Sequence, residues 1–256
     1  MNETVKIIAD STCDLSPELI ERYHIRIVPL HIIMDDVSYD DGFNMTPEKI
    51  YEWSNRTRST PKTSAPNQEE IEKVLKEEAG AHDEIICFTI SSEMSSTAQV
   101  FHLVAEELGL EDRVFVIDSR SLSTGNGLLV IKAAEMAIAG SDGRTITAEI
   151  TKLIPRVRAS FVVDTLTFLY RGGRCSAVAA MAGSALKFHP IIKVTDGKML
   201  PGKKLRGDID KCFELYIHSL REEMASADDS RVFITHSGMD DATIEQRRIS
   251  YTSERQ

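Results

Sequence analysis

Hydroxyl side chains cluster in three separate loops of this 256-residue sequence, and their placement indicates a binding site for a small anion. The three loops contain Thr63 and Ser64; then Ser91, Ser92, Ser95, Ser96 and Thr97; then Ser119, Ser121, Ser123 and Thr124. Hydroxyls and the free N–H groups at helix N-termini both donate hydrogen bonds to anions. The alternative is that each Ser or Thr only caps a helix. Clustering in successive loops favours the anion site.

Two arginines separated by two glycines, Arg171 and Arg174, form a second candidate site. A guanidinium group can hold a carboxylate or a phosphate through two parallel hydrogen bonds. A surface turn with solvated arginines is the alternative, and the residues alone leave both interpretations open.

The common catalytic and cofactor motifs are missing from the sequence. The segment 125–127 lacks the third glycine of a dinucleotide fingerprint, and neither a P-loop nor a nucleophile elbow is present. The seven histidines are scattered, and the four cysteines form no C-x-x-C pair, so reduced thiols are expected. Asp10 and Asp14 flank the first loop, where capping or solvation is favoured over metal binding. We therefore predict no metal, no cofactor and no catalytic residue.

The overall charge and hydropathy exclude several classes of protein. Lys and Arg number 30 against 40 Asp and Glu, so the formal net charge is -10. This acidic balance argues against a nucleic-acid partner, since phosphates are neutralised by clustered basic residues. No stretch approaches the ~18 apolar residues of a membrane span. No secretory signal is seen, so the expected location is the cytoplasm.

Strands alternate with helices over residues 1–155, which predicts an α/β fold with a parallel sheet. Apolar, β-branched runs predict strands at 5–9, 84–89 and 114–117, with a further apolar run at 25–34. Helices are predicted from 17, from 47 to 56, at 68–78, at 97–108 and at 128–139. The Ser/Thr/Pro-rich segment 57–67 is predicted to be a loop.

The alternation changes after Gly143, and residues 156–256 are predicted to form a smaller α+β domain with a mixed sheet. A helix at 148–158 is expected to lead into this domain, whose own expected elements are helices at 177–185 and 208–224 and strands at 160–163 and 231–235. Asp196 and Gly197 between two apolar runs predict a hairpin.

Read together, the loops resemble the DegV family of bacterial fatty-acid-binding proteins. Six segments match the family in order along the chain: D-S-T-C-D-L at 10–15, T-S-A-P at 63–66, S-S-E-M-S-S-T at 91–97, V-I-D-S at 116–119 with G-N-G at 125–127, D-T-L through R-G-G-R-C-S at 164–176, and H-P-I at 189–191. The segments depart from the family at single positions, such as Ala65 in place of Gln and Cys175 in place of Ile.

The resemblance implies two α/β domains with a lipid tunnel between them, similar to the substrate-binding subunit of dihydroxyacetone kinases. It implies a long-chain fatty acid as ligand and a separate ATP-binding kinase subunit as partner. That kinase subunit would phosphorylate the carboxylate to an acyl phosphate for phospholipid synthesis. Thr63 and Ser92 are then expected to hold the carboxylate, with Ser91 close by and Arg171 facing the phosphate or the kinase. The chain would present the acyl group and would not be catalytic alone.

The end of the chain departs from the family pattern. Members of the family usually end in a strand and an H-x-G-P-G segment, whereas this chain ends in a polar tail, 245–256. His236 is not the family histidine, because it ends an earlier predicted strand. We therefore expect an atypical or truncated C-terminus, an exposed strand edge near 231–235, and weaker binding than in a full-length relative.

Two other functions remain open on the sequence. One is a stand-alone kinase or hydrolase acting on a small anion, which needs a nucleotide site, a metal cluster or an activated nucleophile. The other is a regulatory lipid-binding module without a kinase partner. Extraction of bound lipid would distinguish a fatty-acid carrier from a stand-alone kinase or hydrolase. A search for an ATP-binding partner would distinguish a carrier that works with a kinase from a regulatory module.

Overall fold

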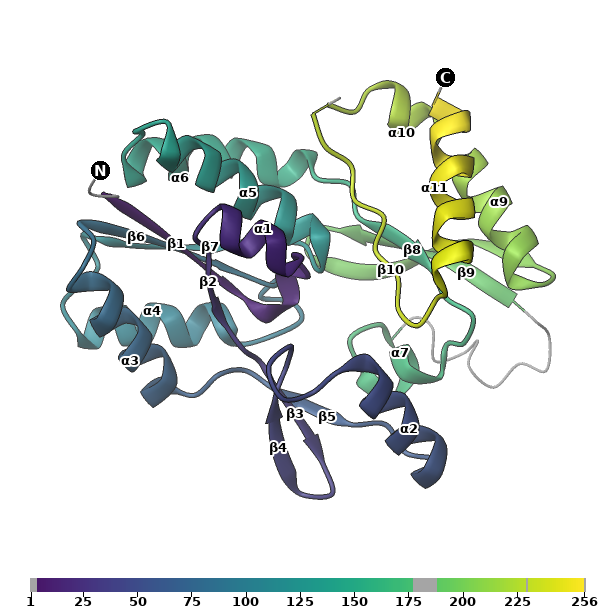
Figure 1. The fold of residues 1–256 in the computed structure, drawn as a ribbon, viewed down its shortest axis with the longest axis horizontal. Helices are drawn as coiled ribbons and strands as arrows, with labels where there is room; N and C mark the ends of the chain where they lie inside the picture. The colour runs from purple at the N-terminus through teal and green to yellow at the C-terminus, as the bar shows by residue number, and fades with distance from the viewer. Residues whose placement is uncertain (1–3, 177–187, 229, 256) are drawn as a thin grey trace. The chain divides into compact units, whose positions relative to one another are not determined.

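The structure is a computed structural model, and it describes residues 4–176, 188–228 and 230–255 (Figure 1). The chain divides into two compact units, which are described separately below. The first unit comprises Met1–Ala159 together with the turn Asp196–Lys198, and the second comprises Ser160–Thr195 and Met199–Gln256.

A four-stranded parallel sheet forms the centre of the first unit. Its strands run in the order β2-β1-β6-β7 and comprise β1 Val5–Asp10, β2 Arg26–Val28, β6 Glu84–Thr89 and β7 Val114–Asp118. Buried β-branched residues dominate these strands, as expected for a parallel sheet covered on both faces. Figure 1 shows α3 and α4 on one face and α1, α5 and α6 on the other. The α/β class predicted from the sequence is confirmed.

The helices of this unit begin where the sequence provides N-terminal signals. Their bounds are α1 Pro17–Arg22, α2 Pro47–Thr57, α3 Gln68–Ala79, α4 Thr97–Glu107, α5 Thr124–Ile138 and α6 Gly143–Leu153, with short 3-10 turns at Ser11–Cys13 and Ile154–Arg156. Ser16 caps α1 ahead of a proline, and Asp142 caps α6. Asn67 and Glu70 form a reciprocal capping box at the start of α3.

A second sheet of the first unit is small and antiparallel. Its strands are β3 His31–Met34, β4 Val37–Asp40 and β5 Lys62–Ser64, in the order β4-β3-β5. Asp35 and Asp36 make the tight turn between β3 and β4, both with positive φ. Two expectations are corrected here. The apolar run 25–34 is two strands in different sheets, and the predicted loop 57–67 contains β5, whose polar residues pair with β3.

The main core of the first unit lies between the parallel sheet and helices α3 and α4. Ile8, Ile71, Leu75, Cys87 and Phe101 are its fully buried members. Burying such side chains contributes roughly 1.5–3 kcal/mol each before the cost of ordering the chain. This core fixes the ends of β1, β6 and β7, and therefore the loops that follow them.

The second unit is built on the antiparallel sheet β10-β9-β8. Its strands are β8 Ser160–Val162, β9 Phe188–Thr195 and β10 Lys198–Arg206. Asp196 and Gly197, with φ of 49° and 81°, form the predicted two-residue hairpin turn. A mixed sheet was expected, but the strands described here pair antiparallel.

The helices of the second unit differ more from expectation. They are α7 Thr167–Gly172, α9 Ile209–Ser219, α10 Arg221–Ala225 and α11 Asp241–Arg255. The predicted helix 208–224 is interrupted at Leu220. The predicted strand 231–235 is not formed, and the polar tail is the helix α11, which packs against α9. The Ala-rich helix expected at 177–185 lies outside the described residues.

Two further boundaries were wrong in the first unit. Helix α5 begins at Thr124, four residues before the predicted start at 128, and α6 begins at Gly143 instead of 148. All four cysteines are buried and unbridged, at positions 13, 87, 175 and 212. In the part of the chain with described placement, no helix is both long and apolar enough to cross a membrane.

Candidate functional site

The loops after β1, β6 and β7 lie at the carboxyl edge of the parallel sheet, where ligands collect in open α/β folds. Hydrogen bonds tie these loops to one another. The N–H of Ser91 donates to the carbonyl of Ser121 (2.9 Å), and the N–H of Ile90 donates to the Asp10 carboxylate (2.8 Å). The structure therefore brings two of the three predicted hydroxyl loops together at this edge.

Ser91 and Ser92 have different environments despite being neighbours. Ser91 is fully buried, and its Oγ accepts a hydrogen bond from the N–H of Glu93 (3.3 Å). Its carbonyl accepts from Met94 and Ser95. Ser92 is exposed, so its hydroxyl can meet a ligand directly. Ser91 therefore stabilises the conformation of the loop, and the side chain of Ser92 is exposed on its surface.

Asp118, at the end of β7, holds the Ser92 loop with both carboxylate oxygens. Oδ2 accepts from the Ser92 hydroxyl (2.5 Å), and Oδ1 accepts from the Ser92 N–H (3.2 Å). Oδ1 also accepts from the N–H of Arg120 (2.8 Å). Asp118 therefore joins the β6–α4 loop to the β7–α5 loop. Sequence reasoning missed this role, although the aspartate stands at the start of a hydroxyl-rich loop.

Asp10 is fully buried at the end of β1, where solvation was one of the expected roles. Burial raises its pKa from 3.8 to about 6, against the opposing effect of hydrogen bonds from Thr12 (2.5 Å) and Ile90. Asp10 caps no helix with its side chain, so both expected roles are corrected. It links the first loop to the second. In the described part of the chain, no three His, Cys, Asp or Glu side chains are grouped to hold a metal ion.

Thr63 lies at the middle of β5 in the small antiparallel sheet, paired with Ile32 and exposed. Its neighbour Ser64 pairs with His31, whose two ring nitrogens contact Asp40 (3.1 Å) and Glu70 (2.9 Å). These contacts fix β3, the strand that pairs with β5, against β4 and the start of α3. No hydrogen bond joins Thr63 to Ser92, both of which lie in the described part of the chain.

The segment Gly125–Gly127, rejected above as a nucleotide motif, has a packing role at the start of α5. A Cβ on Gly127 would lie 2.7 Å from the carbonyl oxygen of Cys13, so only glycine allows this close approach. Between the glycines, Asn126 is fully buried, and no residue of the described part of the chain hydrogen-bonds its amide oxygen or nitrogen. Neither this close packing nor the buried amide was predicted from the sequence, although two glycines one residue apart are compatible with a close backbone approach.

Arg171 is exposed in the last turn of α7 in the second unit, and Gly173 ends that helix with φ of 73°. Arg174 donates to the carbonyl of Gly172 (2.7 Å). Cys175 turns inward and packs with Leu166 and Ile192. The two glycines therefore terminate a helix, and the following cysteine anchors the motif to the core.

The polar tail has a structural role that the sequence did not indicate. Arg247 of α11 is buried, and its guanidinium contacts Asp210 and Glu214 of α9 (3.2 Å to Glu214). The guanidinium also lies 4.4 Å from the ring centroid of Phe213. His236 is exposed and follows no strand, which corrects the earlier placement.

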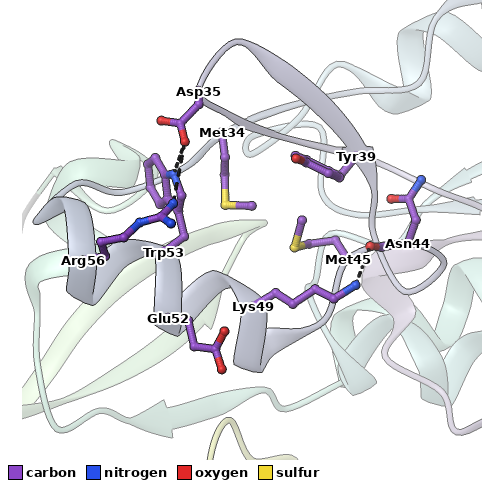
Figure 2. A pocket seen from close by; sticks show the side chains of 9 residues that line it. All are labelled: Met34, Asp35, Tyr39, Asn44, Met45, Lys49, Glu52, Trp53 and Arg56. Atoms are coloured by element: carbon purple, nitrogen blue, oxygen red, sulfur yellow. Dashed lines mark hydrogen bonds and ion pairs between the residues drawn. The ribbon is translucent and has the colours of Figure 1, made fainter.

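A separate pocket of about 550 Å³ lies on the small antiparallel sheet and α2 (Figure 2). Figure 2 shows the thioethers of Met34 and Met45 pointing toward the same space. The indole N–H of Trp53 donates to Asp35 (2.8 Å) at its edge. Its remaining lining residues are Tyr39, Asn44, Lys49, Glu52 and Arg56. Sequence reasoning missed this pocket, which contains none of the predicted site residues.

Comparison with known proteins matches nearly the whole chain to one family. A family model described as "Uncharacterised protein, DegV family" covers residues 4–251. A DegV domain-containing protein of Caldanaerobacter subterraneus is 36% identical over 205 residues, which are 80% of this chain and 72% of that protein.

Two further relatives are described by the ligand that they bind. A fatty acid-binding protein of Thermotoga maritima is 31% identical over 250 residues, covering 94% of this chain and 84% of that protein. The solved structure of a DegV family protein from Thermus thermophilus, described as binding fatty acid, superposes with a TM-score of 0.79 at 30% identity. That match covers 87% of this chain and 79% of the other. Sequence and fold agree, and this chain belongs to the DegV family.

Proposed function

We propose that this protein binds a long-chain fatty acid and presents its carboxylate to a separate ATP-using kinase subunit, which forms an acyl phosphate. The observation that supports the proposal is the similarity to DegV proteins described as binding fatty acids. Ser92 and Thr63 are proposed to hold the carboxylate through hydrogen bonds, and buried Ser91 shapes the loop that carries Ser92.

Hydroxyl donors suit a carboxylate that must later react. They hold the anion through neutral hydrogen bonds, without the strong stabilisation that a buried cation would give the ground state. The acyl chain supplies the affinity instead. Burying ~16 carbons at about 0.8 kcal/mol per CH₂ gives a large driving force before the cost of ordering the chain.

Arg171 is proposed to act toward the kinase. Its exposed guanidinium on α7 can bind phosphate oxygens of the partner's nucleotide or an acidic side chain of the partner. The protein alone is therefore proposed to lack catalytic activity. The acyl phosphate would form only when the kinase subunit and ATP are added.

Lipid extraction tests the binding half of this proposal. The purified protein is denatured and its extract is analysed by mass spectrometry, and the delipidated protein is then titrated with palmitate. A stoichiometric fatty acid or saturable binding is expected. If the extract contains no acid and none binds on addition, the proposal fails.

A reconstitution tests the transfer half. The loaded protein is mixed with ATP and candidate kinase subunits captured by affinity purification, and hydroxylamine traps acyl phosphate as a hydroxamate. Hydroxamate is expected only with the partner present. Acyl phosphate formed by the purified protein with ATP alone would instead support the stand-alone kinase.

A further inference from the structure

The hydroxyl of Ser92 already has an acceptor in this structure. Its Oγ lies 2.5 Å from Oδ2 of Asp118, while the Ser92 N–H is held 3.2 Å from Oδ1 of the same carboxylate. The two bonds fix both the loop and the direction of the hydroxyl proton. A serine hydroxyl has one hydrogen to donate and two lone pairs that accept. Toward a ligand, Ser92 held in this way therefore offers only acceptor sites.

A fatty-acid carboxylate also offers only acceptor sites, so Ser92 and an ionised ligand do not match while Asp118 is charged. If the hydroxyl turned to the ligand, Oδ2 of Asp118 would lose its donor, and two carboxylates would face each other across a single oxygen atom. Like charges at that separation disfavour the doubly ionised state. One proton shared between the ligand and Asp118 removes both problems.

We propose that carboxylate binding at Ser92 is coupled to the uptake of one proton, and that Asp118 is the positioning residue that imposes this coupling. This inference rests on the proposed function. The balance is one ligand carboxylate and one solvent proton entering the site together. The resulting chain runs from the ligand carboxyl O–H to Ser92 Oγ, and from the Ser92 hydroxyl to Asp118. The ligand is thus bound as its neutral acid, or beside a neutral Asp118.

Among the residues with described placement, the charged groups around the pair balance one another and leave none to compensate a ligand carboxylate. The Arg120 guanidinium lies 3.8 Å from Glu93, and Lys198 Nζ lies 3.4 Å from the same glutamate. Asp10, on the neighbouring loop, adds a further carboxyl group. Asp118 and Glu93 together balance Arg120 and Lys198, so an added carboxylate is uncompensated in this group.

The two carboxylate oxygens of Asp118 accept different hydrogen bonds, so the Asp118→Asn substitution can test the proposal. Oδ1 accepts both backbone N–H groups, and Oδ2 accepts only the hydroxyl. An asparagine with its oxygen in the Oδ1 position keeps the backbone bonds, while its nitrogen donates to Ser92 Oγ. The Ser92 hydrogen is then released to donate to an ionised ligand. The variant should therefore keep the loop conformation, while the Ser92 hydroxyl accepts from residue 118 and donates to the ligand.

The probe is decanoate, which is ionised at neutral pH and short enough to be used as a monomer. Calorimetric titrations in phosphate and in Tris, whose ionisation enthalpies differ, give the number of protons taken up per ligand. We expect uptake near one for the unmodified protein and an affinity that falls up to tenfold per pH unit as pH rises. For Asp118→Asn we expect uptake near zero and roughly tenfold tighter binding at pH 8, from a recovered charged hydrogen bond.

Asp112→Asn is the matched control, because Asp112 is exposed just before the opposite end of β7 and its removal changes the net charge equally. It should behave like the unmodified protein. Ser92→Ala is the second variant and should also abolish proton uptake, so the test survives if Asp118→Asn fails to fold. Equal proton uptake in the unmodified protein and in a folded Asp118→Asn or Ser92→Ala variant would overturn this inference alone. Absence of decanoate and palmitate binding to the unmodified protein would overturn the proposed function and this inference with it.

Discussion

The carboxylate of Asp10 accepts a hydrogen bond from the backbone N–H of Ile90, 2.8 Å away and 80 residues later in the chain. The bond joins the end of β1 to the end of β6. The loop that follows β6 carries Ser91 and Ser92, so the position of these hydroxyls depends on a carboxyl group buried at the neighbouring strand. The protonation state of Asp10 should therefore affect the stability of the loops at the carboxyl edge of the parallel sheet.

Stability should fall as pH rises through the range in which Asp10 ionises. Burial raises its folded-state pKa to about 6, above the value of the unfolded chain. Below about pH 4 both states are protonated and the stabilising effect is complete, and it is lost as pH rises through 6. Urea unfolding at pH 5 and pH 7 should show the unmodified protein losing about 1 kcal/mol more than Asp10→Asn over this interval.

Asp142→Asn provides the control for that experiment. Asp142 is an exposed N-cap whose hydrogen bond to Thr145 lowers its pKa, and asparagine caps equally well. The pH dependence of its contribution runs in the opposite direction. The stabilising effect of Asp142 is present at neutral pH and is lost only as pH falls below the ordinary carboxyl range. Asp142→Asn should therefore match the unmodified protein between pH 5 and 7. An equal pH slope in Asp10→Asn would show that Asp10 is not the group responsible.

Gly127→Ala should destabilise the protein even though alanine favours helices. Helix propensity would add about 1 kcal/mol of stability in an exposed helix. The new Cβ would instead lie 2.7 Å from the Cys13 carbonyl and 2.8 Å from Leu15, and such overpacking costs about 1–3 kcal/mol. Gly172→Ala, where no atom of residues 4–176, 188–228 and 230–255 lies within 4 Å of the added Cβ, is the control and should not destabilise. Thermal unfolding of both variants measures the difference, and equal melting temperatures would refute the packing argument.

Arg247→Ala should weaken the second unit chiefly through lost packing. The side chain is 4% exposed and lies on Phe213, whereas its acidic partners Asp210 and Glu214 are largely exposed. We expect a loss of about 2 kcal/mol in urea unfolding, and Arg247→Met should recover part of it because the aliphatic stem provides most of the contact. Arg248→Ala, which removes an exposed pair with Glu245, should change stability by less than about 0.5 kcal/mol. Equal effects of the two alanine variants would contradict this account.

Different substitutions should affect fatty-acid binding and acyl phosphate formation separately. Ser92→Ala and Thr63→Ala each remove a proposed hydrogen bond to the ligand carboxyl group, and affinity for palmitate should fall roughly tenfold or more. Arg171→Ala should leave affinity nearly unchanged and reduce acyl phosphate formed with the kinase partner. Fluorescence titration and hydroxamate trapping measure the two effects. If all three variants lose affinity equally, Arg171 contributes to the ligand site or to folding instead.

The parallel part of the fold was predictable because its signals are local and agree with one another. The capping box of Asn67 and Glu70 marks the start of α3, and the apolar run of β6 was predicted with its observed ends. Strand β5 was missed because Lys62, Thr63 and Ser64 are all exposed and polar, and only pairing with β3 makes them a strand. Tertiary pairing here overrides local propensity.

Two helix errors have a similar origin. The start of α5 reads as a Ser- and Gly-rich loop, yet it is helical, and its Gly127 allows close contact with the turn at Cys13. Helix α11 reads as a polar tail, yet Arg247 is buried against α9. Both helices are fixed by contacts with residues distant in sequence, which a local pattern does not contain.

The candidate site was predictable as a collection of loops, but not as a network. Hydroxyl clustering identified the loops of Ser91 and Ser121, which the structure joins. The bond from Ser92 to Asp118 spans 26 residues and depends on the register of β6 and β7. Residue types suggested what Ser92 could donate, and only the structure shows where its hydrogen points.

The buried cysteines have a kinetic consequence. Burial raises the pKa of Cys13 to about 12 and also raises the pKa of Cys87, so the reactive thiolate is scarce in the folded first unit. Cys175 and Cys212 are buried in the second unit. An alkylating reagent can therefore reach each thiol only during an opening event. Mass spectrometry of the alkylated peptides over time would show which unit opens first, and whether palmitate slows one unit or both.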